Sequence, residues 1–303
     1  MSVRDANDIL RRAASVCASL PAHEILHVVL TWLPPGVELM TDVSPADWVV
    51  GNLKPLDPTG ARLESFVPGG FEAYARIFHP AKFRPARRGV LDPGIGRRWA
   101  DLAREQGLEL TPDIAFVEVS GLEPGDDALD EIAPSDGNLP PETCDSLAAL
   151  LRGHSSTPGV SWFCLWDGNG AFWSASHSPL YPADARQDEI AWYQAEAEAQ
   201  DALLKSTPLV EAYARSYFLF RGPLDAACSF EPAGWHTSPN LWWPDDRAWI
   251  VESEVDGYST YVGASRAALE DLLASSKIEA IEVTLDTHMD PEGYPPRWRS
   301  RTG

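Results

Sequence analysis

Two strand–turn–strand patterns in the second half of the chain constrain its fold more than any other feature. The first turn is Asp167-Gly168-Asn169-Gly170, between the apolar segments 160–166 and 171–175. The second turn is Asp256-Gly257, between residues 247–255 and 258–263. Gly and Asn tolerate the positive φ that tight turns between antiparallel strands require. The sequence therefore predicts two β-hairpins.

Other segments have the apolar spacing of a strand or of a helix. Strands are predicted at 71–79, 113–119, 216–220 and 278–285, and helices at 5–20, 99–103, 144–151, 186–204 and 266–273. These strands and helices do not alternate with the regular rhythm of a β-α-β fold. The pattern predicts an α+β fold with a largely antiparallel mixed sheet and flanking helices.

The chain divides by composition into four parts. Residues 1–120 form a predicted N-terminal α+β part, and residues 121–142, rich in Gly, Pro and acids, form a connection on the surface. Residues 143–287 form a C-terminal α+β part, and the Pro-containing residues 288–303 form a disordered tail. Because the boundary rests on composition alone, the two α+β parts are also compatible with one continuous domain.

The chain is strongly acidic, with 45 Asp and Glu against 24 Lys and Arg and a net charge of −21. A field of this sign repels phosphate backbones, so we expect no nucleic acid partner, whereas a basic protein is a suitable one. No apolar run reaches the roughly 20 residues of a membrane span, so no membrane partner is expected. Cys17, Cys144, Cys164 and Cys228 form no C-x-x-C motif, which is typical of free thiols in a reducing compartment. These features predict a cytoplasmic protein.

Residues 23–27, HEILH, fit the H-E-x-x-H template of zinc peptidases. On a helix, residues i and i+4 have Cβ atoms about 5–6 Å apart, so His23 and His27 can share one metal while Glu24 activates water. On a strand the same two residues lie about 13 Å apart, which a single zinc ion cannot span. The β-forming neighbours favour a strand, and Leu33 stands where a third ligand would be needed. The sequence therefore predicts no metal here, and a zinc hydrolase is the third functional alternative.

The stretch 238–249, SPNLWWPDDRAW, is the most unusual in this tryptophan-rich chain. Adjacent Trp242 and Trp243 point to opposite sides of an extended backbone, so one of them can stack on a ligand. The polar partners for such a ligand are His236, Asn240, Asp245 and Asp246. A ligand pocket is one interpretation of this stretch. A second is a plain turn in which Asp246 pairs with Arg247, and a third is catalysis by the two carboxylates.

Trp166 and Asp167 lie where one predicted strand ends, and Arg221 directly follows another, so we expect all three at one end of the same sheet. Arg221 there can hold a carboxylate or phosphate, or pair with one of the many acids of the chain. The candidate ligand-binding residues are therefore Trp166, Asp167, Arg221, His236, Asn240, Trp242, Trp243, Asp245 and Asp246. The sequence contains no G-x-S-x-G, Walker or complete dinucleotide motif, so we assign no catalytic residue and expect no cofactor.

Five stretches together resemble a family of uncharacterised bacterial proteins: FEAYARIFHPA, WFCLWDG, YFLFRGPL, SPNLWWPDDRAW and TYVG. The resemblance spans residues 45 to 275 and implies a self-contained folded unit. It implies no activity and no catalytic residue, and HEILH lies outside it.

These observations leave more than one function open. The favoured expectation is a non-enzymatic, acidic partner-binding protein of the immunity or inhibitor type, because the net charge is −21 and no complete catalytic set is present. The alternative is a small-molecule-binding protein or hydrolase with a Trp/Asp/His pocket at residues 235–247. The sequence alone does not decide between an enzyme and a binding protein.

Overall fold

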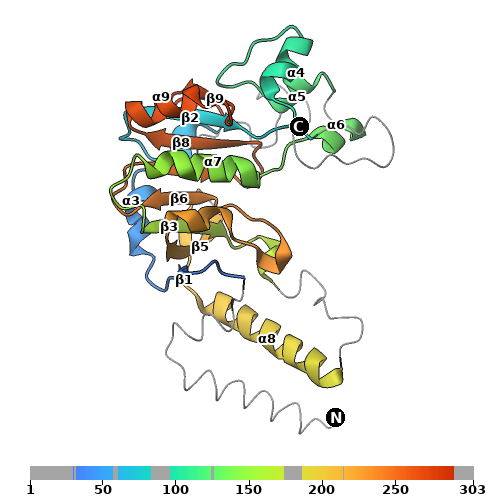
Figure 1. Ribbon diagram of the computed structural model, residues 1–303, viewed down its shortest axis with the longest axis vertical. Coiled ribbons are helices and arrows are strands. Elements are labelled where there is room, and N and C mark those ends of the chain that lie inside the picture. The colour runs from blue at the N-terminus through green and yellow to red at the C-terminus, as the bar shows by residue number, and fades with distance from the viewer. Residues whose placement is uncertain are drawn as a thin grey trace.

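A single antiparallel sheet organises the molecule. The computed structural model describes residues 30, 32–56, 61–82, 96–123, 126–173, 186–213 and 215–289. Within these residues nine strands follow the order β1-β5-β3-β6-β7-β8-β2-β9, and β4 pairs with β5 (Figure 1). They are β1 (Glu38–Leu39), β2 (Ala73–Phe78), β3 (Ser161–Trp166), β4 (Val210–Ala212), β5 (Arg215–Gly222), β6 (Leu241–Pro244), β7 (Ile250–Ser253), β8 (Ser259–Ala264) and β9 (Ala280–Val283). All of their pairings are antiparallel, which confirms the predicted α+β class with a largely antiparallel sheet.

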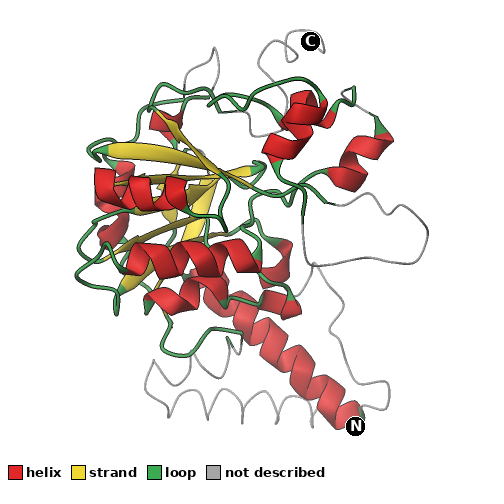
Figure 2. Ribbon diagram, turned by 45° about the horizontal axis from the view of Figure 1, so that its top comes forward, coloured by secondary structure: helices red, strands yellow, loops and turns green. Residues whose placement is uncertain are grey.

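Helices flank the sheet and extend beyond it. The α-helices of the described residues are α3 (Asp47–Val50), α4 (Trp99–Glu105), α5 (Phe116–Ser120), α6 (Asp127–Ile132), α7 (Pro141–Arg152), α8 (Gln187–Ser206) and α9 (Arg266–Ala274). Short 3-10 turns are η1 (Ser44–Ala46), η2 (Leu63–Ser65), η3 (Gly170–Phe172), η5 (Leu224–Cys228) and η6 (Pro232–Gly234). Helices α7 and α9 lie against the sheet, whereas α8 projects away from it (Figures 1 and 2). Among the described residues, no helix has both the length and the apolar character needed to cross a membrane.

The alternation of side chains along each strand gives the sheet two apolar faces. Trp242 of β6 belongs to the buried cluster that also holds Leu147 of α7 and Leu269 of α9. Its neighbour Trp243 points the other way, into the cluster that holds Val49 of α3. Full burial of a large apolar side chain contributes about 1.5–3 kcal/mol. These two layers of helix and sheet therefore account for much of the stability of the fold.

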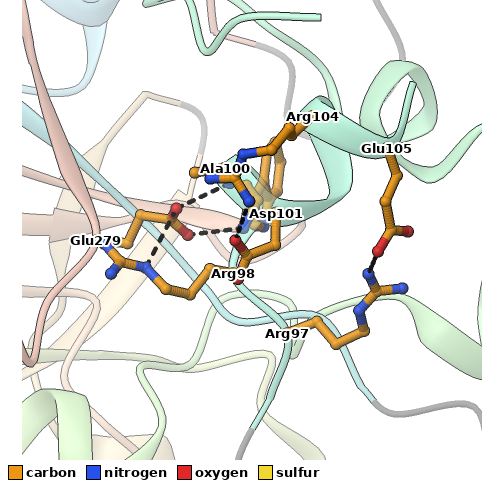
Figure 3. A network of polar contacts seen from close by, with 8 residues as sticks. Arg97, Arg98, Ala100, Asp101, Arg104, Glu105 and Glu279 are labelled. Carbon is orange, nitrogen blue, oxygen red and sulfur yellow. Dashed lines mark hydrogen bonds and ion pairs between the residues drawn. The ribbon is translucent and has the colours of Figure 1, made fainter. Parts of the chain in front are cut away.

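Helices α4 and α5 form a smaller packed unit with the end of β2, where Phe78, Trp99 and Phe116 share a buried cluster. The start of α4 is held by Glu279, which precedes β9 and comes from the far end of the chain (Figure 3). The Glu279 carboxylate accepts hydrogen bonds from the backbone N–H groups of Trp99 (2.7 Å) and Ala100 (2.9 Å). A carboxylate at this position satisfies N–H groups that the first turn of a helix leaves unpaired.

Strand β2 joins the two ends of the chain. Arg76 of β2 lies opposite Tyr261 of β8 on one side and opposite Ile281 of β9 on the other. The first 120 residues and the residues after 142 therefore contribute strands to the same sheet.

The second predicted hairpin is confirmed, because β7 and β8 are adjacent antiparallel strands. Its connection is longer than a two-residue turn: the N–H of Gly257 donates to the carbonyl of Glu254 (2.9 Å), and Gly257 does not adopt a positive φ. The apolar spacing thus predicted the strand pairing, while the glycine serves a wider loop.

The first predicted hairpin is wrong. Strand β3 pairs with β5 and β6, and residues 170–172 form the 3-10 turn η3 in place of a returning strand. The Asn169 side chain accepts a hydrogen bond from the N–H of Ala171 (3.0 Å), so it caps this turn. Asn bonds readily to the backbone two residues ahead, and here that local bond outcompetes a hairpin.

The predicted strand at 113–119 is also wrong, because residues 116–120 form helix α5. The Glu118 carboxylate accepts from the N–H of Ala115 (3.1 Å), and Gly121 ends the helix with a φ of 69°. In so short a run of buried apolar residues, the apolar spacing does not distinguish a strand from a helix. The capping carboxylate of Glu118 and the terminating Gly121 therefore determined the structure.

The remaining predicted elements of the described residues are confirmed. Strands β2, β5 and β9 and helices α4, α7, α8 and α9 lie where the apolar spacing placed them. Ser265 caps α9 by accepting from the N–H of Ala268 (3.2 Å). The predicted helix at 5–20, the HEILH motif and all of the tail except residues 288 and 289 lie outside the described residues.

Candidate functional site

A cavity of about 410 Å³ lies where three loop segments meet beside the ends of β3 and β6. Its lining comes from residues 136–138, Trp166, residues 168–171, residues 235–238, Asn240 and Val255. Small-molecule sites in proteins commonly measure about 300–1,000 Å³. Three of the predicted site residues, Trp166, His236 and Asn240, line this cavity.

Asn240 ties the three walls together. Its side-chain oxygen accepts from the N–H of Trp166 (3.0 Å), and its amide nitrogen donates to the carbonyls of Ser253 (3.1 Å) and Gly137 (3.4 Å). The residue is buried, with 6% of its surface exposed. Because its hydrogen-bonding groups are engaged by the backbone, Asn240 shapes the cavity instead of binding a ligand.

Asn138 fixes the wall at residues 136–138 against the segment before β6. Its amide donates to the carbonyl of His236 (2.8 Å), and its oxygen accepts from the N–H of Ser238 (2.6 Å). The adjacent Gly137 has a φ of 56°, and a Cβ there would lie 2.4 Å from the carbonyl oxygen of Val255. Glycine is therefore required at this point, both for the backbone conformation and for the close approach.

The orientation of His236 determines what it offers to the cavity. Its Nε2 lies 2.9 Å from the carbonyl oxygen of Leu139. A carbonyl only accepts hydrogen bonds, so Nε2 must carry a proton, and whenever the ring is neutral Nδ1 is left with a free lone pair. His236 thus presents a hydrogen-bond acceptor.

Trp166 forms a firm part of the wall. A Cβ at Gly168 would lie 2.2 Å from Trp166 Cζ2, so the backbone packs directly on the indole ring. The guanidinium carbon of Arg215 lies 5.2 Å from the ring centroid. Arg215 is itself paired with Glu254 (2.7 Å) and Asp256 (2.6 Å). The two negative charges of these carboxylates exceed the single positive charge of Arg215.

A buried histidine is bonded to Ser135, the residue that precedes the wall at residues 136–138. His79 has no exposed surface, and its Nδ1 lies 2.7 Å from the carbonyl oxygen of Ser135. Nδ1 must therefore donate, which leaves Nε2 to accept from the hydroxyl of Thr260 (2.8 Å), and Thr260 in turn lies 2.7 Å from the hydroxyl of Ser253. Burial lowers the pKa of His79 to about 4, so the ring is neutral at pH 7. His79 acts as a positioning residue for the strand ends around the cavity.

Several lining groups are left without protein partners. Within the described residues, no hydrogen bond or ion pair engages the Asp136 carboxylate or the Asn169 amide nitrogen. Trp235 is 71% exposed, although large apolar side chains are usually buried. These groups and His236 Nδ1 are the parts of the cavity that can contact a ligand.

The two adjacent tryptophans of the predicted site lie elsewhere. Trp242 and Trp243 are 0% and 1% exposed, and neither lines the cavity. Trp242 packs edge-on against Trp249 at 5.4 Å, and Trp243 packs edge-on against Trp48 at 5.9 Å. Their rings point to opposite faces of the sheet, as the alternation of a strand requires, and both faces are covered by core.

Asp245 and Asp246 lie in the turn that follows β6. The indole N–H of Trp162 donates to Asp245 (3.0 Å). Asp246 accepts from the backbone N–H (2.6 Å) and hydroxyl (2.7 Å) of Ser156. Burial acts to raise the pKa of Asp246, but the hydrogen bonds from Ser156 and its neighbours outweigh it and lower the pKa. These contacts are those of a structured turn.

Arg221 and Asp167 also lie apart from the cavity lining. The guanidinium carbon of Arg221 is 5.8 Å from the ring centroid of Trp162. Asp167 follows β3, and partial burial together with the nearby Glu211 carboxylate raises its pKa. The backbone carbonyl of Asp167 accepts from the indole N–H of Trp173 (2.6 Å).

A fully buried acid lies within the sheet itself. Glu252 of β7 has no exposed surface, and neither carboxylate oxygen has a hydrogen-bond partner among the described residues. Burial raises its pKa well above the ordinary value, the neighbouring Glu254 raises it further, and Arg215 opposes both. Burial therefore favours the neutral, protonated form of Glu252 in the folded protein.

Sequence reasoning missed Asp136, Asn138 and Asn169, and it included Trp235 only within the predicted pocket range 235–247. Residues 136–138 belong to the predicted surface connection, although an Asp-Gly-Asn sequence suits a wall that needs positive φ at its centre. Trp235 is adjacent to the predicted His236, and an exposed aromatic residue beside a polar cluster is the signal that indicates it.

Among the described residues, no group of three or more His, Cys, Asp and Glu side chains can hold a metal ion. His23, Glu24 and His27 lie outside those residues. Comparisons with protein-family models, with curated proteins and with solved structures find no match to this chain.

Proposed function

We propose that the chain is a small-molecule-binding protein and that its ligand site is the cavity lined by residues 136–138, Trp166, residues 168–171, residues 235–238 and Asn240. The observation that carries this proposal is the cavity of about 410 Å³ with Trp235 71% exposed beside its polar lining. An aromatic ring left in solvent next to unpaired polar groups is typical of a surface that a ligand covers.

Binding suits this site better than catalysis. The Ser238 hydroxyl accepts from the N–H of Leu139 (2.8 Å), while His236 is bonded to the carbonyl of Leu139 (2.9 Å). A nucleophile must be hydrogen-bonded to its base, and these lining residues are engaged with the backbone instead. The rigid walls held by Asn138 and Asn240 favour a preformed binding site.

The test is a thermal-shift titration with glucose, AMP and cadaverine, which represent neutral, anionic and cationic ligands. A ligand that binds the native state raises the melting temperature, and the rise grows with the logarithm of the ligand concentration once this exceeds the dissociation constant. We expect at least one of the three compounds to stabilise the protein and Trp235→Ala to abolish the effect. Leu108→Ala, which shortens another exposed apolar side chain (43% exposed) outside the cavity, should leave it intact.

Two results would overturn the proposal. One is that none of the three compounds changes the melting temperature of the wild type. The other is that a stabilising compound acts equally on wild type and Trp235→Ala, because its site would then lie elsewhere.

We propose as a second candidate that the acidic surface binds a basic protein in the cytoplasm. The observation that favours it is the charge of −21, with nine acids and no base in residues 113–142. The described cysteines are free, as expected in a reducing compartment. Native mass spectrometry of protein from its own cells should reveal a basic companion of fixed stoichiometry that dissociates as salt is raised. Free monomer at every salt concentration would contradict this candidate.

A further inference from the structure

We infer that the cavity binds a small organic cation, namely an alkylammonium or guanidinium compound. This inference rests on the proposed function, because it specifies the ligand class of the same site. Three independent features of the lining carry it: the sign of its charge, its remaining hydrogen-bonding groups and its exposed aromatic ring.

The charge of the lining is negative. Among its residues, all of which the structure describes, Asp136 is the only acid, and neither Lys nor Arg occurs. The guanidinium that stacks on Trp166 belongs to Arg215, which is already bonded to Glu254 (2.7 Å) and Asp256 (2.6 Å). A phosphate or carboxylate ligand would find no free cation in these walls, whereas a positive ligand finds an unpaired carboxylate.

The hydrogen-bonding groups that remain are acceptors at Asp136 and His236 and donors at the Asn169 amide and the Trp235 indole. Asp136 offers two carboxylate oxygens, and His236 offers Nδ1 because its Nε2 donates to Leu139. The amide groups of Asn138 and Asn240 are engaged by the backbone, as described above. An ammonium or guanidinium group has only donors, so it can bond to Asp136 and His236, and its charge strengthens the bond to the Asp136 carboxylate.

The exposed Trp235 adds a third contribution. The face of an indole ring attracts cations, and among aromatic side chains Trp does so most strongly. Trp235 and Asp136 line the same cavity, so one ligand can contact both. A short alkyl chain with a positive end therefore gains binding free energy from the ring and from the carboxylate at the same time.

The test compares cadaverine with 1,5-pentanediol, which has the same carbon chain and no charge. Isothermal titration should show binding of cadaverine and affinity for the diol at least about tenfold weaker, corresponding to about 1.4 kcal/mol. Asp136→Asn should weaken cadaverine binding about fivefold, as expected for one partly exposed ion pair. Raising the ionic strength from about 0.01 M to 0.15 M should also weaken it, because the screening length falls.

Glu142→Gln is the matched control, because it removes the same charge from an exposed residue of α7 outside the cavity. Cadaverine should bind this variant as it binds the wild type. Equal weakening in Asp136→Asn and Glu142→Gln would overturn the inference, because it would indicate attraction to the acidic surface as a whole.

The remaining outcomes separate the inference from the proposed function. If glucose or AMP binds in a manner that depends on Trp235 while cadaverine does not bind, the inference of a cationic ligand is refuted and the proposal of a ligand site is supported. If none of the compounds binds, both are refuted.

Discussion

The buried carboxyl of Glu252 gives the sharpest test of the structure, because its protonation must change the stability of the fold with pH. The side chain has no exposed surface, and its oxygens have no hydrogen-bond partner among the described residues. A charged carboxylate in this position would lose its hydration without compensation, so the folded protein keeps the proton. The perturbation that tests this is Glu252→Gln, which keeps the shape and removes the titrating group.

The direction of the effect follows from proton linkage. The ordinary pKa of a glutamate is 4.5, and burial raises the pKa of Glu252 well above that value in the folded state. Between these two pKa values the folded protein holds one more proton than the unfolded chain. The free energy of unfolding must therefore fall by about 1.4 kcal/mol for each unit of rising pH. This contribution is fully present below pH 4.5 and is lost as the pH rises through the folded pKa.

The assay is equilibrium denaturation by urea, followed by tryptophan fluorescence at pH values from 5 to 7. For every pH unit that lies below the folded pKa, the Glu252 contribution falls by about 1.4 kcal/mol. The difference in unfolding free energy between Glu252→Gln and the wild type should shift in favour of the variant by that amount. Glu282→Gln alters an exposed glutamate of β9 and should leave the pH dependence unchanged.

A pH dependence that is the same in Glu252→Gln and in the wild type would refute the reasoning. It would mean that the carboxylate is ionised in the folded protein and therefore has a partner or water contact. If Glu252→Gln fails to fold, Glu252→Met provides the same comparison, because an apolar chain of similar length suits the cluster that surrounds it.

Three further predictions concern the supports of the fold and of the cavity. The pKa of His79 is about 4 in the folded protein, whereas the ordinary pKa of histidine is 6.5. The free energy of unfolding should therefore fall by about 3 kcal/mol as the pH drops from 6.5 to 4. Urea titrations of His79→Gln should show a weaker pH dependence than those of the wild type. Glu279→Ala should lower the unfolding free energy by about 1–2 kcal/mol, since two N–H groups lose their acceptor, while Glu105→Ala, at an exposed position, should change it by less than about 0.5 kcal/mol. Gly168→Ala should destabilise the protein by at least about 1 kcal/mol and shift the emission of the indole that it contacts, whereas Gly159→Ala, with no atom within 4 Å of its added Cβ, should do neither.

The fold class was predictable because it depends on patterns that many residues share. The apolar run of β5 and the alternation in β9 each indicate a strand, and β7 and β8 confirm that two such runs around a glycine pair with each other. Helix α5 was not predictable from apolar spacing. In so short a segment a single capping carboxylate and one glycine determined the structure, and such contributions of about 1 kcal/mol are weak signals in sequence.

The cavity was only partly predictable, for a different reason. Trp166, His236 and Asn240 meet there because β3 and β6 are neighbours in the sheet, and no local pattern shows which strands will be neighbours. Trp242 and Trp243 were predicted site residues because adjacent tryptophans are rare. Both sides of β6 are covered by core, however, so neither ring is available to a ligand. Chemical rarity in a sequence does not indicate exposure.

The position of β2 between β8 and β9 has a consequence for the order in which the protein can form. Ribosomes synthesise the chain from its amino terminus onward, so β2 emerges long before β8 and β9, the two strands that flank it. Until residues 259–264 and 280–283 have been made, the backbone groups of β2 have no partners and can pair with another nascent chain. Final folding therefore awaits the last fifth of the sequence, and premature termination there leaves an aggregation-prone product instead of a smaller working protein.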